Sequence, residues 1–318
     1  MKIFVSGAAG FIGSHLCERL LVEGNRLTGV DNLDPFYPPE FKEENLNILK
    51  AHDGFQFFES DIRAPEMNDI ITSAKPDVIV HLAAMAGVRP SIENPEKYIS
   101  VNVGGTFNLL DAAEKNGIKS FIFASSSSVY GGNTKLPFSE KDSVDNPVSP
   151  YAATKKAGEL LCYTYHHLYH MDVTCLRFFT VYGPRQRPEM AIYSFTEKIM
   201  GGEKVPLFSM GKSKRDYTYI DDIIDGVLLS MKKMGGYRVY NLGESKITDL
   251  LELVAIIEET TGKKADCELL PHQPGDMMVT YADISKAREE IGYHPRWGVK
   301  EGMKVFVDWY MKTRRKEA

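Results

Sequence analysis

The sequence predicts an α/β fold: a doubly wound parallel sheet covered by helices on both faces, with a smaller α/β lobe interleaved with it. Short β-branched runs alternate with amphipathic stretches through the first half of the chain, which is typical of strand–helix–strand units. After Phe178 the pattern loosens into segments interrupted by Gly and Pro, as expected for a smaller lobe. With 318 residues, 43% of them hydrophobic, the chain is long enough to bury a sizeable core.

The first half predicts strands and helices in alternation, at the spacing that a doubly wound sheet requires. The expected strands are Lys2–Ser6, Arg26–Asp31, Phe55–Glu59, Val78–Leu82, Ser120–Ser125 and Val173–Phe178. The expected helices are Phe11–Glu23, Pro39–Lys50, Ala64–Ser73, Ile92–Asn116 and Tyr151–His170.

The second half predicts shorter elements between Gly and Pro breaks. Helices are expected at Ala191–Met200, Asp221–Met234, Ile247–Thr261, Ser285–Ile291 and Lys300–Lys312. Short strands are expected at Val205–Phe208, Arg238–Asn241 and Asp266–Leu269. No repeat or linker-like tract separates the halves, so we expect one continuous structure with a cleft between two lobes.

Charge and cysteine usage exclude several classes of protein. Lys plus Arg is 38 and Asp plus Glu is 43, a net charge of -5, which argues against a nucleic-acid partner. The four cysteines are scattered without a Cys-x-x-Cys pair, which indicates free thiols in a reducing compartment and no metal site. The longest apolar run, 78–88, is interrupted by His81 and is shorter than the ~20 residues of a membrane helix. Without a signal-peptide pattern at its start, the protein is expected to be cytoplasmic, with no membrane partner.

The glycine run that follows the first strand predicts a dinucleotide site. In Gly7-Ala-Ala-Gly10-Phe-Ile-Gly13 the glycines let backbone N–H groups approach a pyrophosphate at the start of a helix. Asp31 ends the next strand, where a carboxylate binds ribose hydroxyls and repels a 2′-phosphate, so we expect NAD rather than NADP. We therefore expect a Rossmann-type cofactor domain over 1–178, with returns near 216–243, and a mainly substrate-binding lobe over 179–318.

The cofactor contacts are expected at the ends of the first four strands. Asp61-Ile62 follows the third strand, where a carboxylate reaches the adenine amino group or caps a turn. Small residues after His81 let the backbone pass close to the cofactor, although tight helix–sheet packing predicts the same residues. The expected cofactor-binding residues are Gly7, Gly10, Phe11, Ile12, Gly13, Asp31, Asn32, Asp61, Ile62, Leu82, Ala83, Ala84, Tyr151 and Lys155.

A tyrosine and a lysine four residues apart predict proton-transfer chemistry. Tyr151 and Lys155 share one face of the helix that follows Pro150. A tyrosine with a pKa near 10 is a poor base at neutral pH, but a nearby ammonium and an oxidised nicotinamide favour the phenolate. Such pairs also occur by chance on amphipathic helices, but the serines that end the fifth strand, Ser126 among them, add hydroxyls that can hold the reacting oxygen.

These motifs together resemble an extended short-chain dehydrogenase/reductase of the nucleotide-sugar epimerase group, and the resemblance covers essentially the whole chain. The matching positions are Gly7, Gly10, Gly13, Ser126, Tyr151 and Lys155. Within the group, segments 82–89, 177–190 and 214–222 most resemble UDP-glucuronic acid 4-epimerases. Dehydratases and decarboxylases carry an acid beyond the catalytic hydroxyl, where this chain has Ser127 and Ser128, and galactose-type epimerases usually carry Asn at Thr180.

The resemblance implies a substrate and a reaction. It implies that NAD takes a hydride from C4 of a UDP-sugar, that the 4-keto sugar turns over within the site, and that re-reduction gives the other epimer. A uronate carboxylate needs charge-assisted donors. Arg187 and Arg185 are the candidate cations, with Arg187 favoured; the alternative is that both serve the diphosphate or solvent. The expected substrate-binding residues are Arg89, Ser127, Ser128, Thr180, Arg187, Arg215 and Asp276.

Several alternatives stay open from the sequence. Arg215 either reaches the diphosphate, as the resemblance implies, or pairs on the surface with Asp216 or Asp222. Gln273 stands where many relatives carry a diphosphate-binding Arg, so the second diphosphate contact is open. The main alternative function is 4-epimerisation of UDP-glucose or UDP-N-acetylglucosamine. Less favoured alternatives are a UDP-glucuronate decarboxylase and a non-catalytic NAD-binding regulator. Relatives pair the two long helices expected here at Ile92–Asn116 and Tyr151–His170 across a two-fold axis, so a homodimer is expected by analogy. The resemblance also implies a role in carbohydrate metabolism.

Overall fold

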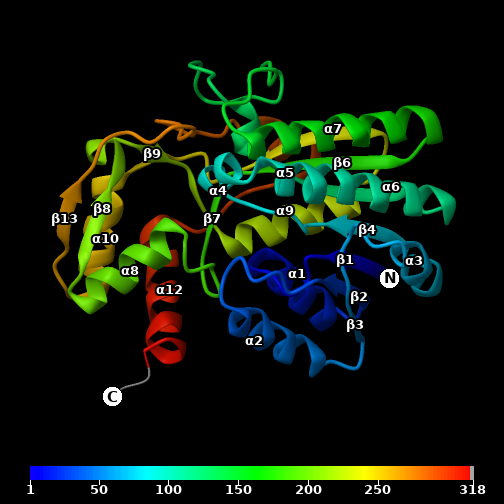
Figure 1. Cartoon of the computed structure of the whole chain (residues 1–318), viewed down its shortest axis with the longest axis horizontal. Coiled ribbons are helices and arrows are strands. Elements are labelled where there is room, and N and C mark those ends of the chain that lie inside the picture. Colours follow the sequence, from blue (N-terminus) through cyan, green and yellow to red (C-terminus); the bar gives the residue numbers. More distant parts are fainter. Residues whose placement is uncertain (316–318) are drawn as a thin grey trace.

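The computed structural model describes residues 1–315 and contains the expected doubly wound sheet, which confirms the Rossmann-type fold. Seven parallel strands lie in the order β3-β2-β1-β4-β5-β6-β11 (Figure 1). They are β1 (Lys2–Ser6), β2 (Arg26–Asp31), β3 (Phe55–Glu59), β4 (Val78–His81), β5 (Ser120–Ser126), β6 (Asp172–Phe178) and β11 (Tyr237–Leu242). The order reverses between β1 and β4, and such a switch point opens a crevice at the carboxyl ends of the strands.

Helices cover both faces of this sheet because its strands are apolar on both sides. Ile3 and Val5 of β1 belong to one buried cluster and Phe4 to the other, as the alternation of a strand requires. One face is covered by α1 (Phe11–Val22), α2 (Pro39–Lys50) and α9 (Ile220–Lys232). The other is covered by α3 (Met67–Ala74), α6 (Gly105–Lys115) and α7 (Pro150–Tyr169).

The second lobe lies beside the carboxyl end of the sheet and occupies the left of Figure 1. Its parallel strands β8 (Lys204–Leu207) and β13 (Asp266–Leu269) pair with each other, and a 3-10 turn, η3 (Phe208–Gly211), follows β8. Its helices are α8 (Ala191–Gly201), α10 (Leu250–Thr261) and α12 (Val299–Thr313), whereas α11 (Ser285–Ile291) packs back on β11. Most predicted elements therefore occur, with ends moved by three residues or fewer.

Two short strand pairs connect the lobes, and neither pairing was predicted. β7 (Thr180–Tyr182) pairs in parallel with β10 (Tyr217–Tyr219), and β9 (Lys214–Arg215) pairs antiparallel with β12 (Thr248–Asp249). Strands of two or three residues carry no alternation that a sequence pattern can reveal.

The single helix expected at Ile92–Asn116 is wrong, because the structure divides this segment. It contains α4 (Val88–Glu93), α5 (Pro95–Tyr98), a π-helical stretch η1 (Ile99–Gly104) and α6. The break is at Asn94, whose φ of -137° and ψ of 66° leave the helical region. A residue before proline is pushed out of the α conformation, and the Asn94 side chain then caps the next turn by accepting a hydrogen bond from Lys97 N at 3.2 Å.

Candidate active site

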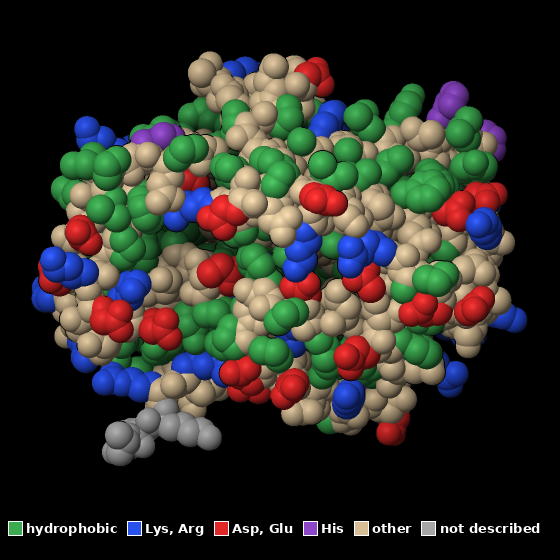
Figure 2. Space-filling model, in the orientation of Figure 1, with side chains coloured by type: hydrophobic (Ala, Val, Ile, Leu, Met, Phe, Trp, Pro, Cys, Tyr) green, Lys and Arg blue, Asp and Glu red, His purple; other side chains and the backbone are tan. Residues whose placement is uncertain are grey.

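A cavity of about 750 Å³ lies where the carboxyl ends of the strands meet the second lobe. The space-filling view shows the surface hollowed between the two lobes, with acidic and basic side chains at the rim (Figure 2). The residues expected to bind the cofactor, to act in catalysis or to bind the substrate all line this one cavity: the glycine turn, Asp31, Asn32, Asp61, Ile62, Leu82, Ala83, Ala84, Ser126, Tyr151, Lys155, Arg89, Ser127, Ser128, Thr180, Arg187, Arg215 and Asp276.

The glycine turn between β1 and α1 fits a pyrophosphate. Gly7 has a φ of 75°, and a Cβ there would lie 2.8 Å from Ala83 N. A Cβ on Gly13 would lie 2.0 Å from the Gly7 carbonyl oxygen, so the turn closes only with glycines. Gly10 caps α1 without a side-chain hydrogen bond, which leaves the helix N-terminus to the cavity. Backbone donors and the helix dipole make this a suitable place for the phosphates of NAD.

Asp31 is held in place at the end of β2. Its carboxylate accepts hydrogen bonds from Ala9 N at 3.2 Å and Leu33 N at 2.9 Å. Lys42 of α2, itself buried, pairs with the same carboxylate at 3.3 Å. These contacts orient Asp31 at the cavity wall, where a ribose hydroxyl can donate to it.

Asp61 follows β3 and lines the part of the cavity where the cofactor is expected. Arg63 donates to its carboxylate, and this contact, more than any other, lowers the pKa of Asp61 to about 2. Asn32 donates to Oδ2 of the same carboxylate at 2.9 Å. Asp61 is therefore ionised at neutral pH and acts only as an acceptor, as a contact to an amino group requires.

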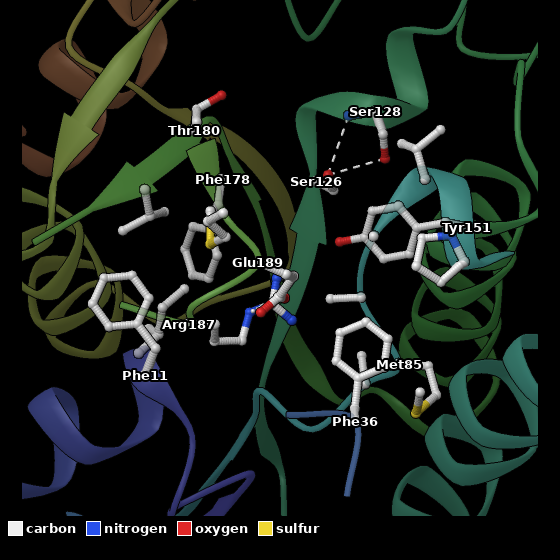
Figure 3. Close-up of a pocket in the computed structure, with 18 of the residues that line it drawn as sticks. Phe11, Phe36, Met85, Ser126, Ser128, Tyr151, Phe178, Thr180, Arg187 and Glu189 are labelled. Atoms are coloured by element: carbon white, nitrogen blue, oxygen red, sulfur yellow. Dashed lines mark hydrogen bonds and ion pairs between the residues drawn. The ribbon is translucent and has the colours of Figure 1, made fainter. Parts of the chain in front are cut away.

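Tyr151 and Lys155 are brought together at the start of α7. Ser149 caps this helix by accepting from Ala152 N at 3.2 Å, so that Tyr151 begins the helix at the cavity wall. The Lys155 ammonium lies 6.0 Å from the centre of the Tyr151 ring and donates to the Ala124 carbonyl at 2.7 Å. Figure 3 shows the Tyr151 hydroxyl pointing toward Ser126, which accepts from Ser128 N and Ser128 Oγ at 3.2 and 3.0 Å.

Burial shifts both groups toward their neutral forms. It raises the pKa of Tyr151, an effect partly offset by the Ser126 hydroxyl and the Arg187 guanidinium. It lowers the pKa of Lys155 to about 8. At neutral pH the free site therefore holds a protonated phenol beside a charged ammonium.

A buried ion pair supports the strand that carries Ser126. Arg177 of β6 donates to Glu159 of α7 through two bonds of 2.8 Å, and Ser125 donates to the same carboxylate at 2.7 Å. Glu159 was not among the site residues expected from the sequence. Its signal was present, because Glu159 follows Lys155 by four residues and therefore continues the Tyr151–Lys155 face of the helix.

Arg187 lies on the opposite wall, in the loop that leads to α8. Its Nε pairs with Glu189 Oε1 at 3.1 Å, and its guanidinium carbon lies 5.8 Å from the centre of the Phe36 ring. In Figure 3, Arg187 and Glu189 lie together between Phe11 and Phe178 on one side and Tyr151 on the other. Glu189 and Phe36 were not predicted as site residues. An acid two residues from a candidate substrate arginine was the available signal.

Three further charged residues lie at the other end of the cavity. Arg215 donates to the Lys214 and Met278 carbonyls, whereas Asp216 and Asp222, the surface partners that the sequence left open, accept hydrogen bonds from other backbone N–H groups. Burial lowers the pKa of Arg215. Arg89 pairs with Asp276 at 2.9 Å and lies 4.3 Å from the centre of the Phe208 ring.

Two residues considered from the sequence are outside the cavity lining. Arg185 pairs with Glu18 of α1 and contacts His15 Nδ1 at 3.2 Å, which anchors the loop rather than presenting a cation to the cavity. Gln273 does not line the cavity either. Within residues 1–315 there is no acid, Cys or His cluster suited to a metal ion, and no helix of that range is long and apolar enough to span a membrane.

Known proteins resemble the chain over its full length. A family model described as the NAD dependent epimerase/dehydratase family matches residues 3–243. A UDP-glucuronate 4-epimerase of Thermodesulfobacterium geofontis is 44% identical over 307 residues, which cover 96% of this chain and 94% of the relative.

Solved structures share the fold and differ in the sugar they hold. A UDP-glucuronic acid 4-epimerase from Bacillus cereus, in complex with UDP-glucuronic acid and NAD, superposes with a TM-score of 0.93 at 36% identity, covering 98% of this chain and 99% of that one. A UDP-glucose 4-epimerase from Thermotoga maritima with UDP-glucose superposes with a TM-score of 0.91 at 34% identity, covering 99% and 100%.

Proposed function

Because the chain belongs to the NAD-dependent epimerase/dehydratase family, we propose that it interconverts UDP-glucuronate and UDP-galacturonate at C4 of the sugar. The broader activity, NAD-dependent 4-epimerisation of a UDP-sugar, is that of the relatives and solved structures, and the chain is an isomerase of this kind. The cofactor is NAD. Residues 1–178, with the return at β11, hold the cofactor, and residues 179–315 supply most of the sugar-nucleotide contacts.

One observation carries the choice of a uronate: a guanidinium faces the Tyr151 hydroxyl across the cavity. Arg187 lines the same cavity as Tyr151 and is close enough to lower the pKa of its phenol. A sugar whose 4-hydroxyl meets Tyr151 would therefore place C5 and its carboxylate within reach of this cation. Ser127, Ser128 and Thr180 add hydroxyl donors on the cavity wall. Charge-assisted donors of this kind offset the desolvation of a carboxylate.

The proton steps follow from the placement of Tyr151, Ser126 and Lys155. The glycine turn and the N-terminus of α1 would hold NAD, which would supply the acceptor and donor of the C4 hydride. In its phenolate form, which the positive charge of an oxidised nicotinamide would favour, Tyr151 takes the proton of the 4-hydroxyl and gives it back after the 4-keto sugar has turned over, while Ser126 holds the reacting oxygen. The Lys155 ammonium favours the phenolate electrostatically.

Arg187 has a second task once the sugar is oxidised. A 4-keto uronate is a β-keto acid, which loses CO2 when the bond to its carboxylate aligns with the ketone. Fixed donors on the carboxylate hold that bond out of alignment. Epimerisation without decarboxylation therefore depends on the Arg187 wall of the cavity.

The sugar is tested by product analysis on three substrates. UDP-glucuronate, UDP-glucose and UDP-N-acetylglucosamine are each incubated with the purified protein, with and without added NAD, and the products are separated and identified by proton NMR. Conversion of UDP-glucuronate to UDP-galacturonate at a kcat/KM well above that for the neutral sugars is expected. A preference for UDP-glucose or UDP-N-acetylglucosamine would withdraw the carboxylate role of Arg187.

The pKa of Lys155 predicts how activity depends on pH. Because burial lowers this pKa to about 8, the ammonium loses its proton as the pH rises through 8 and no longer favours the phenolate. We expect kcat to fall above about pH 8. Lys155→Arg keeps the charge and should remove this descending limb, even if the plateau is lower. A wild-type kcat that stays constant to pH 10, with the protein still folded by circular dichroism, would contradict this role.

We also infer a homodimer from two neighbouring helical segments with apolar exposed side chains. Ile99 of η1 and Phe107 of α6 are 56% and 50% exposed, and Leu160 and Leu168 of α7 are 55% and 58% exposed. An apolar face of this kind, on helices that pack side by side, is typical of an interface.

Phe107→Glu should convert this dimer into a monomer, because a carboxylate would be buried without a partner at the interface. Light scattering after size exclusion measures the mass. Leu251→Glu is the matched control, since Leu251 is 56% exposed but lies on α10 of the other lobe. A monomeric wild type, or equal effects of the two variants, would contradict the proposed interface.

A further inference from the structure

Glu189 places a carboxylate of the protein inside the proposed uronate subsite. Its Oε1 lies 3.1 Å from Arg187 Nε, and both residues line the cavity. Figure 3 shows the two side chains together at the centre of the view, facing the Tyr151 wall. Within residues 1–315, Glu189 is the acid that pairs with Arg187. The guanidinium is thus already neutralised by an acid when no sugar is bound.

The two charges act on the same neighbours. Burial raises the pKa of both Tyr37 and Tyr98, the Arg187 guanidinium opposes this shift, and the Glu189 carboxylate adds to it. Tyr37 also lines the cavity. Glu189 is therefore not directed away from the site, although its side chain is 39% exposed while that of Arg187 is 20% exposed.

The loop beneath this pair is anchored independently of it. Arg185 is tied to Glu18 and His15 of α1, and Gln186 donates to the Val181 carbonyl at 3.1 Å. Removing the charge of Glu189 should therefore change the electrostatics at Arg187 without releasing the loop.

We propose that Glu189 limits the selectivity of the site for uronates over neutral sugars. Its carboxylate pairs with Arg187 and so competes with the carboxylate of the substrate. This inference rests on the proposed function, in which Arg187 binds the uronate. When a neutral hexose is bound, Glu189 keeps Arg187 from becoming an uncompensated charge. When a uronate is bound, two carboxylates share one guanidinium and repel each other. Glu189 therefore lowers the discrimination between uronate and neutral sugar.

Glu189→Gln tests this role because it removes the charge and nearly preserves the shape. The dissociation constants of UDP-glucuronate, UDP-glucose and UDP are measured by calorimetry on the NAD-bound protein. The variant should raise the ratio of the UDP-glucose to the UDP-glucuronate constant by about tenfold, mainly through tighter uronate binding, with UDP unchanged. Glu189→Ala should raise the same ratio if the glutamine variant fails to fold.

Glu203→Gln is the matched control. Glu203 pairs with Lys198 at 3.3 Å, is 65% exposed and does not line the cavity. The ratio of the two dissociation constants in Glu203→Gln should therefore stay within about twofold of wild type. An unchanged ratio in Glu189→Gln would overturn the inference, and a lower ratio would show that Glu189 orients Arg187 instead of competing with the substrate. Failure of the wild type to form UDP-galacturonate would remove the proposed function itself, whereas these ratio outcomes in an active wild type overturn only the role of Glu189.

Discussion

Replacing Tyr151 by phenylalanine should lower kcat by at least about 10³-fold while changing the affinity for UDP-glucuronate by less than about threefold. The phenol is the group placed to take the proton of the 4-hydroxyl, and phenylalanine keeps the ring and removes only the oxygen. The helix start is set by Ser149 and the buried position of Lys155 by Ala124, and neither contact involves the Tyr151 hydroxyl.

Comparing turnover with substrate affinity distinguishes a loss of catalysis from a loss of folded protein. Turnover is followed by NMR and binding by calorimetry with UDP-glucuronate. Tyr98→Phe is the matched control, because its hydroxyl donates at 2.7 Å to the Ala86 carbonyl and its ring meets that of Tyr151 edge-on at 6.3 Å. It should retain most of the turnover. A Tyr151→Phe variant with near wild-type kcat would remove Tyr151 from the chemistry.

Replacing Arg187 by alanine should weaken binding of UDP-glucuronate by about 10- to 100-fold and that of UDP by less than about threefold. Losing charge-assisted bonds to a desolvated carboxylate costs about 1.5–3 kcal/mol. Glu189, left without its partner, would add repulsion of the substrate carboxylate. The remaining turnover should release CO2 and a UDP-pentose, since the oxidised sugar is then free to align its carboxylate with the ketone.

Binding of UDP-glucuronate and UDP is measured in parallel, with released CO2 trapped and counted. Arg296→Ala is the matched control, because Arg296 pairs with Asp225 outside the cavity and is 70% exposed. Equal losses for UDP-glucuronate and UDP would move Arg187 to the nucleotide end of the site. Intact uronate affinity would exclude it from the carboxylate contact.

The sheet and the residues around the cavity were predictable because each rests on a strong local signal. Gly7 and Leu82 directly follow the apolar strands β1 and β4, and parallel strands bring such ends to one edge of the sheet. Tyr151 and Lys155 were predictable as a pair because four residues make one helical turn. The prediction of a uronate substrate depended on the loop that carries Arg187. There, only the resemblance to UDP-glucuronic acid 4-epimerases favoured Arg187 as the residue that binds the carboxylate.

The remaining features depend on contacts between distant segments. Lys42 of α2 reaches Asp31 at the end of β2, and no local pattern predicts such a buried pair. The Asn-Pro sequence at 94–95 signalled the break, but the helix expected at Ile92–Asn116 was drawn through it. Glu189 looked like one more charged loop residue until the structure placed its carboxylate beside Arg187 within the cavity.

Oxidation and re-reduction at C4 of a UDP-uronate can be followed with one labelled substrate. UDP-glucuronate carrying deuterium at C4 is incubated with the purified protein in ordinary water, and the product is analysed by NMR and mass spectrometry. We expect UDP-galacturonate that keeps deuterium at C4, without release of CO2. Loss of the deuterium to water, or conversion to a UDP-pentose, would contradict it.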